Sequence, residues 1–502
     1  MNLRAGVPMS LVCKVRLMGI LFLGLICISC GDVYRPTIIP NPVPTPDPKN
    51  FHSAIAISQN ASVYPGSGMQ VDVSGDSNAG VTKVAVGPVH GAIQPGCSQT
   101  ACKVWVANNL SDSVSVFFAA TSVAATSGGS IGTSTDINLL LGSRPVFVHS
   151  TETGTMYVAN SGKLTDPNTL QTYYAVDAIS ATTPTTGVLT TEIRVAGTTP
   201  WALAETPDGK KLYVVNRDSN NVTVINTVDK SVGATVPVGA APSLAYARND
   251  SQRVYVLNPG GGTISTIRTI DDVVVKDNNN ADPPVDSGAN FMIYDGHLNR
   301  LYVTSSSGSL YVFNTAVDPD SQTTSFLIKQ IPIPGAGDCA QCVPVSVAAL
   351  SDGTRVYVGS AFETTDTTKC VQVVGGSPVN CYLTQITVVD AASLTIKTGS
   401  ATAPNPFPVP TPTATVLAGA PVLAQAGCAT TRFRLSVVPA SDSSRVFLAA
   451  CDASGVSTIN TANDTYVVTL PAPVSAFPPI QTDPNVPPQP PRQNPVFLLT
   501  GQ

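Results

Sequence analysis

The sequence is poor in the residues on which most catalytic and nucleic-acid-binding sites depend. Only 12% of its 502 residues are charged, and it holds two tryptophans and four histidines. The histidines share no spacing and stand at His52, His90, His149 and His297. Binding to a nucleic-acid backbone needs grouped Lys and Arg, and since no such group appears we expect no nucleic-acid partner. No nucleophile elbow, phosphate-binding loop or EF-hand calcium loop is present, so we predict no catalytic residue, no metal and no cofactor.

The chain also lacks an apolar run of the roughly 20 residues that a transmembrane helix needs. The apolar stretch at residues 17–29 follows three basic residues and indicates an export signal. It ends in Ser29-Cys30-Gly31, which resembles a bacterial lipoprotein signal with Cys30 as the lipidated first residue. Plain secretion is the alternative. By the same resemblance, Gly31 in place of Asp favours the outer membrane, facing the periplasm or the cell surface, with this lipid as the only membrane contact.

Proline is abundant at both ends of the mature chain. Residues 30–51 carry alternating prolines, which disfavour helix and sheet and favour an extended polyproline II segment. We interpret them as a tether, or as a tail with no further role. Residues 471–502 form a second proline-rich tail, whose apolar residues 496–499 could pair with an open sheet edge. Removing residues 1–29 takes away three of the 27 basic residues and none of the 32 acidic ones, which leaves a net charge of −8.

Between these ends the chain repeats a pattern of four short strands. It is clearest in residues 203–239, where three runs of β-branched residues are separated by turn-forming residues and preceded by a fourth run at 201–205. The core of the second strand recurs seven times, as Val104-Trp105-Val106, Met156-Tyr157-Val158, Leu212-Tyr213-Val214, Val254-Tyr255-Val256, Leu301-Tyr302-Val303, Val356-Tyr357-Val358 and Val446-Phe447-Leu448. A repeat of about 40–50 residues carrying four strands is typical of a β-propeller blade.

This repeat resembles the YVTN β-propeller family. The best match is Pro207-Asp208-Gly209, then Leu212-Tyr213-Val214, then Pro237-Val238-Gly239 after the outer strand. The resemblance covers about residues 80 to 470 and implies an all-β, seven-bladed β-propeller of four-stranded antiparallel blades. It implies little about function, because the family is known by its scaffold. Within a propeller domain of residues 52–470, the expected blades are approximately 80–142, 143–197, 199–239, 241–285, 288–333, 343–400 and 431–470.

Two segments compete for the strand that closes the ring. Residues 69–74 would be the outer strand of the seventh blade if the N-terminus completes it, and residues 466–470 fit the same position. The sequence leaves both open. An eighth blade inside the proline-rich insertion at residues 404–412 is disfavoured, because no core triplet occurs there.

Eight cysteines follow Cys30, an even number that indicates disulfides in an exported chain. Neighbours in the sequence suggest the pairs Cys97 with Cys102, Cys339 with Cys342, Cys370 with Cys381, and Cys428 with Cys451. Strand order supports the last pair, whose members would lie at the same end of two adjacent antiparallel strands. We expect the Cys339–Cys342 pair to be structural, since no His follows it to hold haem and no helix N-terminus is expected to lower a thiol pKa. A zinc site is the alternative, and the oxidising compartment disfavours it.

Three of these pairs fall on one face of the expected propeller. That face is built by the loops leading into the innermost strands and by the loops between second and third strands. Two of these loops are long, one of each kind, at 335–343 and 361–381. Long loops on one face of a rigid scaffold are common binding sites, and disulfides reduce the entropy such loops lose on binding. The candidate binding residues are Glu363, Asp366, Lys369, Arg432 and Asp452. The alternative is that the disulfides only stabilise an exported fold.

The expected function is a non-enzymatic binding or interaction scaffold in the cell envelope, acting as a monomer on an unknown protein or envelope ligand. A periplasmic lactonase-like propeller hydrolase and a structural cell-surface protein are the alternatives. A histidine with two or more carboxylates at the channel mouth would favour the hydrolase. We interpret the aromatic residue of each triplet as packing between blades. Four strand-ending asparagines are interpreted as turn residues rather than a ring of ligands: Asn108, Asn160, Asn216 and Asn258.

Overall fold

Short antiparallel strands dominate the regular structure of the computed structural model. The residues it describes are 53–60, 63–72, 77–95, 101–120, 131–151, 154–180, 188–364, 373–374, 377–378, 381–400, 403–409, 428, 431–475 and 492–501. All of them belong to one compact unit, Thr45–Gln502. None of the helices among these residues is long and apolar enough to cross a membrane.

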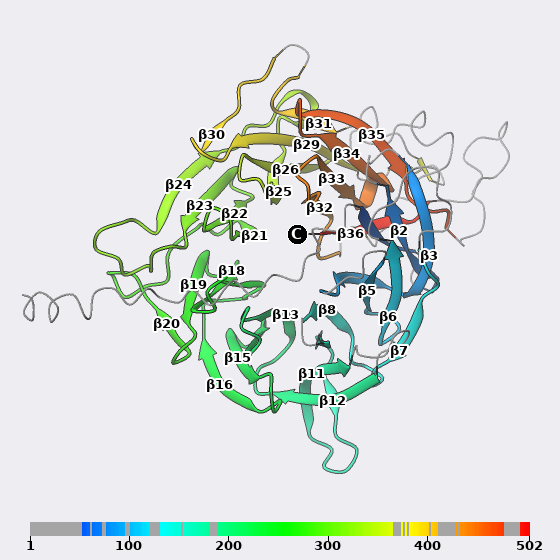
Figure 1. Ribbon diagram of the computed structural model, residues 1–502, viewed down its shortest axis with the longest axis vertical. Helices are drawn as coiled ribbons and strands as arrows, with labels where there is room; N and C mark the ends of the chain where they lie inside the picture. Colours follow the sequence, from blue (N-terminus) through cyan, green and yellow to red (C-terminus); the bar gives the residue numbers. More distant parts are fainter. Residues whose placement is uncertain are drawn as a thin grey trace, which may run out of the picture. The chain divides into compact units, whose positions relative to one another are not determined.

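Seven blades follow one another along the chain, and in each blade successive strands lie farther from a common axis (Figure 1). Blade 1 comprises β4 (Pro88–Ile93), β5 (Ala101–Asn108), β6 (Ser113–Ala120) and β7 (Thr135–Asn138). Blade 2 comprises β8 (Pro145–Ser150), β9 (Thr155–Asn160), β11 (Thr172–Ser180) and β12 (Val188–Val195), with the short β10 (Leu164–Thr165) beside β11. Blades 3 and 4 comprise β13 (Pro200–Glu205), β14 (Lys211–Asn216), β15 (Asn221–Asn226) and β16 (Val232–Pro237), then β17 (Leu244–Ala247), β18 (Arg253–Asn258), β19 (Thr263–Arg268) and β20 (Val273–Val275).

The later blades carry the larger insertions. Blade 5 comprises β21 (Ala289–Asp295), β22 (Arg300–Ser305), β23 (Ser309–Asn314) and β24 (Leu327–Pro332). Blade 6 comprises β25 (Val343–Ala349), β26 (Arg355–Thr364) and β29 (Cys381–Asp390), against which both β30 (Thr395–Ile396) and β31 (Phe407–Val409) pair. Blade 7 comprises β32 (Leu435–Pro439), β33 (Arg445–Ala450), β34 (Gly455–Asn460) and β35 (Thr465–Pro471). Outside the blades lie the hairpin β27 (Val373–Val374) and β28 (Ser377–Pro378), and the 3₁₀ turns η2 (Gly337–Cys339) and η4 (Cys451–Ala453).

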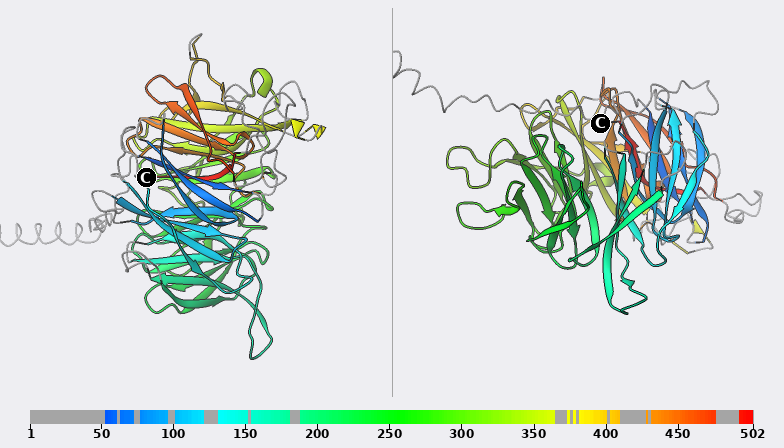
Figure 2. Two further views of the ribbon diagram at one scale, coloured as in Figure 1. Left: turned by 90° about the vertical axis from the view of Figure 1, so that its right-hand side faces the viewer. Right: turned by 60° about the horizontal axis from the view of Figure 1, so that its bottom comes forward.

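The two ends of the chain build an eighth blade together. The C-terminal strand β36 (Asn494–Thr500) is innermost and pairs with β1 (Ala54–Gln59), which is followed outward by β2 (Pro65–Val71) and β3 (Asn78–Val86). The expectation that residues 496–499 pair with an open sheet edge is confirmed, since Phe497 lies opposite Ile57. Figure 2 shows the blades from the side, standing next to one another around the axis. Because the last strand, β36, completes the eighth blade, the described sheets form a continuous ring.

The prediction of seven blades is wrong, because the described strands form eight. Residues 80–86, at which the first blade was expected to begin, lie in β3 at the outer edge of blade 8. Of the two segments considered for the outer strand of blade 7, residues 466–470 occupy it as part of β35, whereas residues 69–71 lie in β2 of blade 8. The repeat pattern missed blade 8 because β1 has Ile55-Ala56-Ile57 where the other blades have an aromatic triplet. Within the 404–412 insertion, β31 adds to blade 6.

The triplet aromatics pack between neighbouring blades, as the sequence predicts. Tyr213 is fully buried in a cluster that also contains Val254 and Val256 of the next blade. Its hydroxyl donates to Asp272 Oδ1 at 2.6 Å, and Lys211 Nζ lies 2.8 Å from Asp272 Oδ2. Asp272 sits in the turn between the third and outer strands of blade 4, so this contact joins two blades. We call such contacts tyrosine latches; the others join Tyr157 to Lys230, Tyr255 to the Thr315 carbonyl, and Tyr357 to Asp464.

The strand-ending asparagines are part of the scaffold, but their bonds differ from the expectation. Asn216 Nδ2 donates to Thr223 Oγ1 at 2.9 Å, and Asn258 Nδ2 donates to Ser265 Oγ at 3.0 Å, so their partners are side chains of the third strand rather than backbone groups. This packing explains the glycine of the Pro-Val-Gly motif. A Cβ on Gly239 would lie 2.7 Å from Asn258 Nδ2, too close for any side chain.

The direction of the strands defines two faces of the ring. Innermost strands begin at the face that carries the loops between second and third strands, such as residues 217–220 and η4; we call this the entry face. They end at the opposite, exit face, where the tyrosine latches lie. Asn494 Oδ1 accepts a bond from Ser454 Oγ beside η4, so β36 also begins at the entry face. Because Ala54 lies opposite Thr500, β1 begins at the exit face.

Candidate functional site

Residues 431–434 carry an aromatic side chain onto the axis of the propeller, just before β32 begins. The ring of Phe433 lies 5.2 Å from that of Phe497 in β36 and 5.9 Å from that of Phe291 in β21, in an edge-on arrangement with the latter. His90 of β4 lies 6.2 Å from Phe433 and stacks on Phe147 of β8 at 3.9 Å. Aromatic rings from blades 1, 5 and 8 therefore surround Phe433, and Phe147 of blade 2 packs against His90. We call residues 431–434 the axial segment.

Arg432 extends across the axis from blade 7 to the opposite side of the ring. Its Nη1 donates to the carbonyl of Trp201 in blade 3 at 2.6 Å, and its Nη2 donates to the carbonyl of Ser243, just before blade 4, at 2.7 Å. The guanidinium carbon also lies 5.3 Å from the centre of the Phe147 ring. No carboxylate of the described residues lies within ion-pair distance of Arg432. Burial therefore lowers the pKa of Arg432 to about 9.

Trp201 lies between two arginines. Its ring centre is 5.2 Å from the guanidinium carbon of Arg432 and 4.0 Å from that of Arg217, both within cation–π distance. Arg217 follows β14 directly and pairs with its neighbour Asp218, with Nε 2.9 Å from Oδ1. Trp201, Arg217 and Arg432 are all partly exposed at the entry face. We call these three residues the mouth site.

The five binding residues predicted from the sequence separate into three groups. Glu363 and Asp452 both bind Arg434, whose Nη1 lies 2.9 Å from Glu363 Oε2 and whose Nε lies 2.6 Å from Asp452 Oδ2. Arg432 instead belongs to the mouth site. Asp366 and Lys369 lie outside the described residues. The structure thus brings Glu363, Arg432 and Asp452 to the entry face, and two of them serve an ion network within that face.

The sequence alone did not identify Arg434, Phe433 or the two mouth-site residues of blade 3, Trp201 and Arg217. Arg434 also stacks on Tyr382, with its guanidinium carbon 4.1 Å from the ring centre. A signal for the blade 3 residues was available. Trp201 and Arg217 stand at positions where the other well-matched repeats have small, polar or aliphatic residues, so a position-by-position comparison of the blades would have singled them out.

Two disulfides are present in full among the described residues. Cys339 joins Cys342, and Cys428 joins Cys451, at Cα–Cα distances of 5.0 and 5.7 Å. The second bond fixes the backbone three residues before the axial segment, at the entry face, and both of its cysteines are fully buried. Cys102 is also disulfide-bonded, while its expected partner Cys97, Cys370 and the side chain of Cys381 lie outside the described residues.

The described histidines do not form the cluster that would favour a hydrolase. His90 is buried, its Nδ1 accepts a bond from the backbone N–H of Val148, and burial together with Arg432 holds its pKa well below 6.5. His149 pairs with a single carboxylate, with Nε2 3.4 Å from Glu205 Oε2, near the exit ends of β8 and β13. The described residues hold no group of three His, Cys, Asp or Glu side chains suited to a metal ion.

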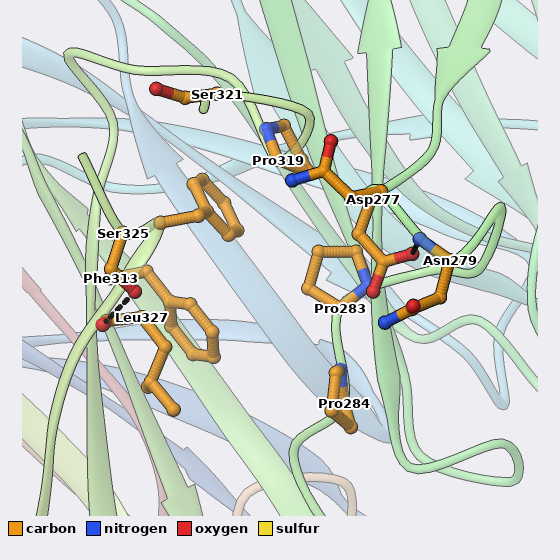
Figure 3. A pocket seen from close by; sticks show the side chains of 11 residues that line it. Asp277, Asn279, Pro283, Pro284, Phe313, Pro319, Ser321, Ser325 and Leu327 are labelled. Atoms are coloured by element: carbon orange, nitrogen blue, oxygen red, sulfur yellow. Dashed lines mark hydrogen bonds between the residues drawn. The ribbon is translucent and has the colours of Figure 1, made fainter. Parts of the chain in front are cut away.

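A pocket of about 240 Å³ lies away from the axis, between the outer loops of blades 4 and 5. Figure 3 shows Asp277 beside Pro283 on one side and Phe313 and Leu327 on the other. Asp277 Oδ1 accepts bonds from the backbone N–H groups of Asn279 and Ala281, so it stabilises its own turn. The volume is below the range of about 300–1,000 Å³ common for small-molecule sites. The axis therefore offers the stronger candidate.

Comparison with known proteins supports the fold alone. No protein-family model and no curated protein sequence matches the chain. Among solved structures, apo AztD from Citrobacter koseri is similar with a TM-score of 0.51 and 10% identity, over 90% of this chain and 98% of that one. The dihydro-heme d1 dehydrogenase NirN in complex with DHE has a TM-score of 0.50 and 12% identity, over 84% of this chain and 73% of that one. Virginiamycin B lyase from Staphylococcus aureus has a TM-score of 0.44 and 12% identity, over 74% and 93%. The chain is a β-propeller, similar in fold to AztD and NirN.

Proposed function

We propose that this chain is a non-enzymatic binding module of the YVTN-repeat type, exported and anchored through a lipid on Cys30, which binds a protein or another cell-envelope ligand at its entry face. The axial segment carries the proposal. It places Phe433 among aromatic side chains on the axis and Arg432 above them, so the centre of this face presents a packed surface with a guanidinium. The ion network of Arg434 and the Cys428–Cys451 disulfide hold the adjoining loops of blades 6 and 7.

The Cys428–Cys451 disulfide and the ion network of Arg434 order the loops of this face before a partner binds. Pre-ordered loops lose less entropy on binding, which is an advantage of the disulfide and the ion network at this face.

Site-specific photo-crosslinking in cells tests the choice of face. A photoreactive residue replaces Leu141 or Asn220 at the entry face, or Val228 or Ile270 in turns at the exit face. Val228 and Ile270, which are 83% and 86% exposed, are the matched controls for Leu141, which is 93% exposed. We expect adducts from the entry-face positions only. Adducts mainly from the exit face would contradict the choice of face, and no adduct from any position would contradict a binding module.

A lactonase-like hydrolase remains the second candidate, and the His149–Glu205 pair is the observation in its favour. Glu205 Oε1 is buried and has no hydrogen-bond partner among the described residues, so the carboxylate has an oxygen left for a further proton donor. Lactone hydrolysis by the purified mature chain, lost on His149→Gln, would replace the binding proposal. Absence of any turnover that depends on His149 would remove this candidate.

A further inference from the structure

Three side chains at the entry face depart from the repeat. Trp201 follows the proline that opens β13, where blades 1, 2 and 6 have Val89, Val146 and Val345. Arg217 follows the asparagine that ends β14, where blades 1, 2 and 4 have Asn109, Ser161 and Pro259. Packing within the repeat therefore requires neither a tryptophan nor an arginine at these positions. Arg432 lies in the segment before β32 and contacts Trp201, which belongs to the opposite side of the ring, and Arg217 contacts the same indole ring.

The charges at this point do not cancel. Asp218 is the one carboxylate within ion-pair distance of Arg217 among the described residues, and its other oxygen, Oδ2, accepts a bond from Thr199 Oγ1 at 2.6 Å. The hydrogen-bond partners of Arg432 among the described residues are both backbone carbonyls. Two guanidinium groups thus contact a single indole ring, and of the two only Arg217 has a carboxylate partner among the described residues, in a chain whose overall charge is negative. A buried or half-buried positive charge without a counter-ion is costly, and an anion placed beside it removes much of that cost.

The chemistry of the two cations selects the kind of anion. A guanidinium presents several N–H donors in a plane, which suits the paired oxygens of a carboxylate or a phosphate. Two of the Arg432 nitrogens are directed to carbonyls, while its Nε has no partner among the described residues. Arg217 is 36% exposed, so a ligand from solvent can reach it. Trp201 between them supplies an apolar wall for the carbon atoms of a ligand.

We propose that the mouth site binds an oxyanion, a carboxylate or phosphate group of an acidic ligand, between Arg217 and Arg432 beside Trp201. This rests on the proposed function, since it names the chemistry of a ligand that binds at the entry face. The ligand's acidic group replaces the missing counter-ion of Arg432, and its remaining parts extend over the entry face.

The site contains its own spectroscopic probe. The chain has two tryptophans, of which Trp105 is fully buried and Trp201 is partly exposed at the site. The mature chain is titrated with sodium phosphate in one series and sodium acetate in another, at constant ionic strength set with sodium chloride. We expect a saturable change of tryptophan fluorescence that is absent in Trp201→Phe. Saturation with phosphate alone, with acetate alone or with both identifies which source of the oxyanion the site accepts.

Variants separate the site from general charge effects. We expect Arg217→Gln to weaken binding of the probe at least fivefold and Arg432→Gln to abolish it. Arg268→Gln is the matched control, because Arg268 is 42% exposed and pairs with Asp271 at the exit face as Arg217 pairs with Asp218. Since Arg217 lies at the surface, its variant remains informative even if Arg432→Gln folds poorly.

The outcomes distinguish this inference from the proposed function. No saturable response to either anion, or equal weakening by Arg217→Gln and Arg268→Gln, overturns the oxyanion site. If entry-face crosslinking succeeds in that case, the binding module stands and its ligand is not held by an acidic group. A saturable response with crosslinking confined to the exit face supports the oxyanion site and overturns the choice of face.

Discussion

Two arginines on opposite faces of this propeller, Arg355 and Arg432, have opposite surroundings. At the exit face, Arg355 and the hydroxyl of Tyr357 both bind Asp464 of the next blade, with Arg355 Nη1 2.7 Å from Asp464 Oδ1. At the entry face, Arg432 lies among Phe147, Trp201 and Phe433 with no carboxylate partner among the described residues. The first arrangement recurs, since Lys211 and the Tyr213 hydroxyl bind Asp272 in the same way, whereas the second occurs once among the described residues. Recurrence marks contacts that hold the scaffold, and the single departure marks the candidate site.

The difference also concerns what each contact joins. A tyrosine latch connects one blade to its neighbour and completes the packing between them. The axial segment connects blade 7 to blades on the far side of the ring, so it depends on the closure of all eight blades. Four predictions test whether this division between scaffold and site holds.

The largest expected effect is at Phe433. Phe433→Ala removes a buried ring from the axis, and we expect it to lower the free energy of unfolding by about 4 kcal/mol, because the surrounding rings cannot fill the space. Urea denaturation of the purified protein measures the change. Phe118→Ala, at a residue 36% exposed on β6, is the control and should cost less than about 1 kcal/mol. A small loss at Phe433 would mean that the axial segment is not packed into the ring.

Removing one charge from each face should give unequal results. Asp464→Ala leaves Arg355 and the Tyr357 hydroxyl without their carboxylate, and we expect a loss of about 3 kcal/mol. Arg432→Met removes two hydrogen bonds but also a charge without a counter-ion, and we expect a change within about 1 kcal/mol. The same denaturation assay compares the two. A loss at Arg432 as large as that at Asp464 would show that Arg432 is a scaffold residue.

The carboxylate of Asp177 provides a test by pH. Asp177 is buried in β11, accepts a bond from Asn160 Nδ2, and has its pKa raised by burial from 3.8 to about 6. The folded chain therefore retains a proton that the unfolded chain releases, and this contribution is lost as the pH rises from about 4 to 6. Asp177→Asn keeps an acceptor for Asn160 without the charge. We expect it to match the wild type at pH 4 and to exceed it by about 3 kcal/mol at pH 7. Parallel pH profiles for the two proteins would contradict the raised pKa.

The smallest expected effect separates two latches. Tyr213 binds a carboxylate, whereas Tyr255 binds the Thr315 carbonyl at 3.2 Å. Bonds to charged groups contribute more, so Tyr213→Phe should cost about 2 kcal/mol and Tyr255→Phe about 1 kcal/mol. Equal losses, measured by urea denaturation, would show that ring packing rather than the hydroxyl determines the strength of the latch.

Much of the scaffold could be predicted from the sequence, because it is encoded locally. The triplet around Tyr213, the turn residues that flank it and the alternation of apolar positions act over a few residues, and they identify seven blades. Blade 8 escaped the prediction because its second strand has Ile55 and Ile57 in place of the aromatic triplet, and because β36 comes from the other end of the chain. Of the binding residues expected at the entry face, Arg432 belongs to the candidate site, while Glu363 and Asp452 bind Arg434.

The sequence by itself determined the blade pattern and the placement of Cys428 and Cys451 at the same end of two adjacent strands. It also determined the positions at which residues depart from the repeat. The tertiary structure alone decided how many blades close the ring and which of those positions meet. Each blade is specified by contacts within itself and with its neighbours. The sequence pattern of one blade therefore does not encode how many blades the ring contains. Trp201 and Arg432 are 231 positions apart and touch only because closure places blade 7 across the axis from blade 3. Their contact follows from the closure of the ring, and no local sequence pattern encodes that closure.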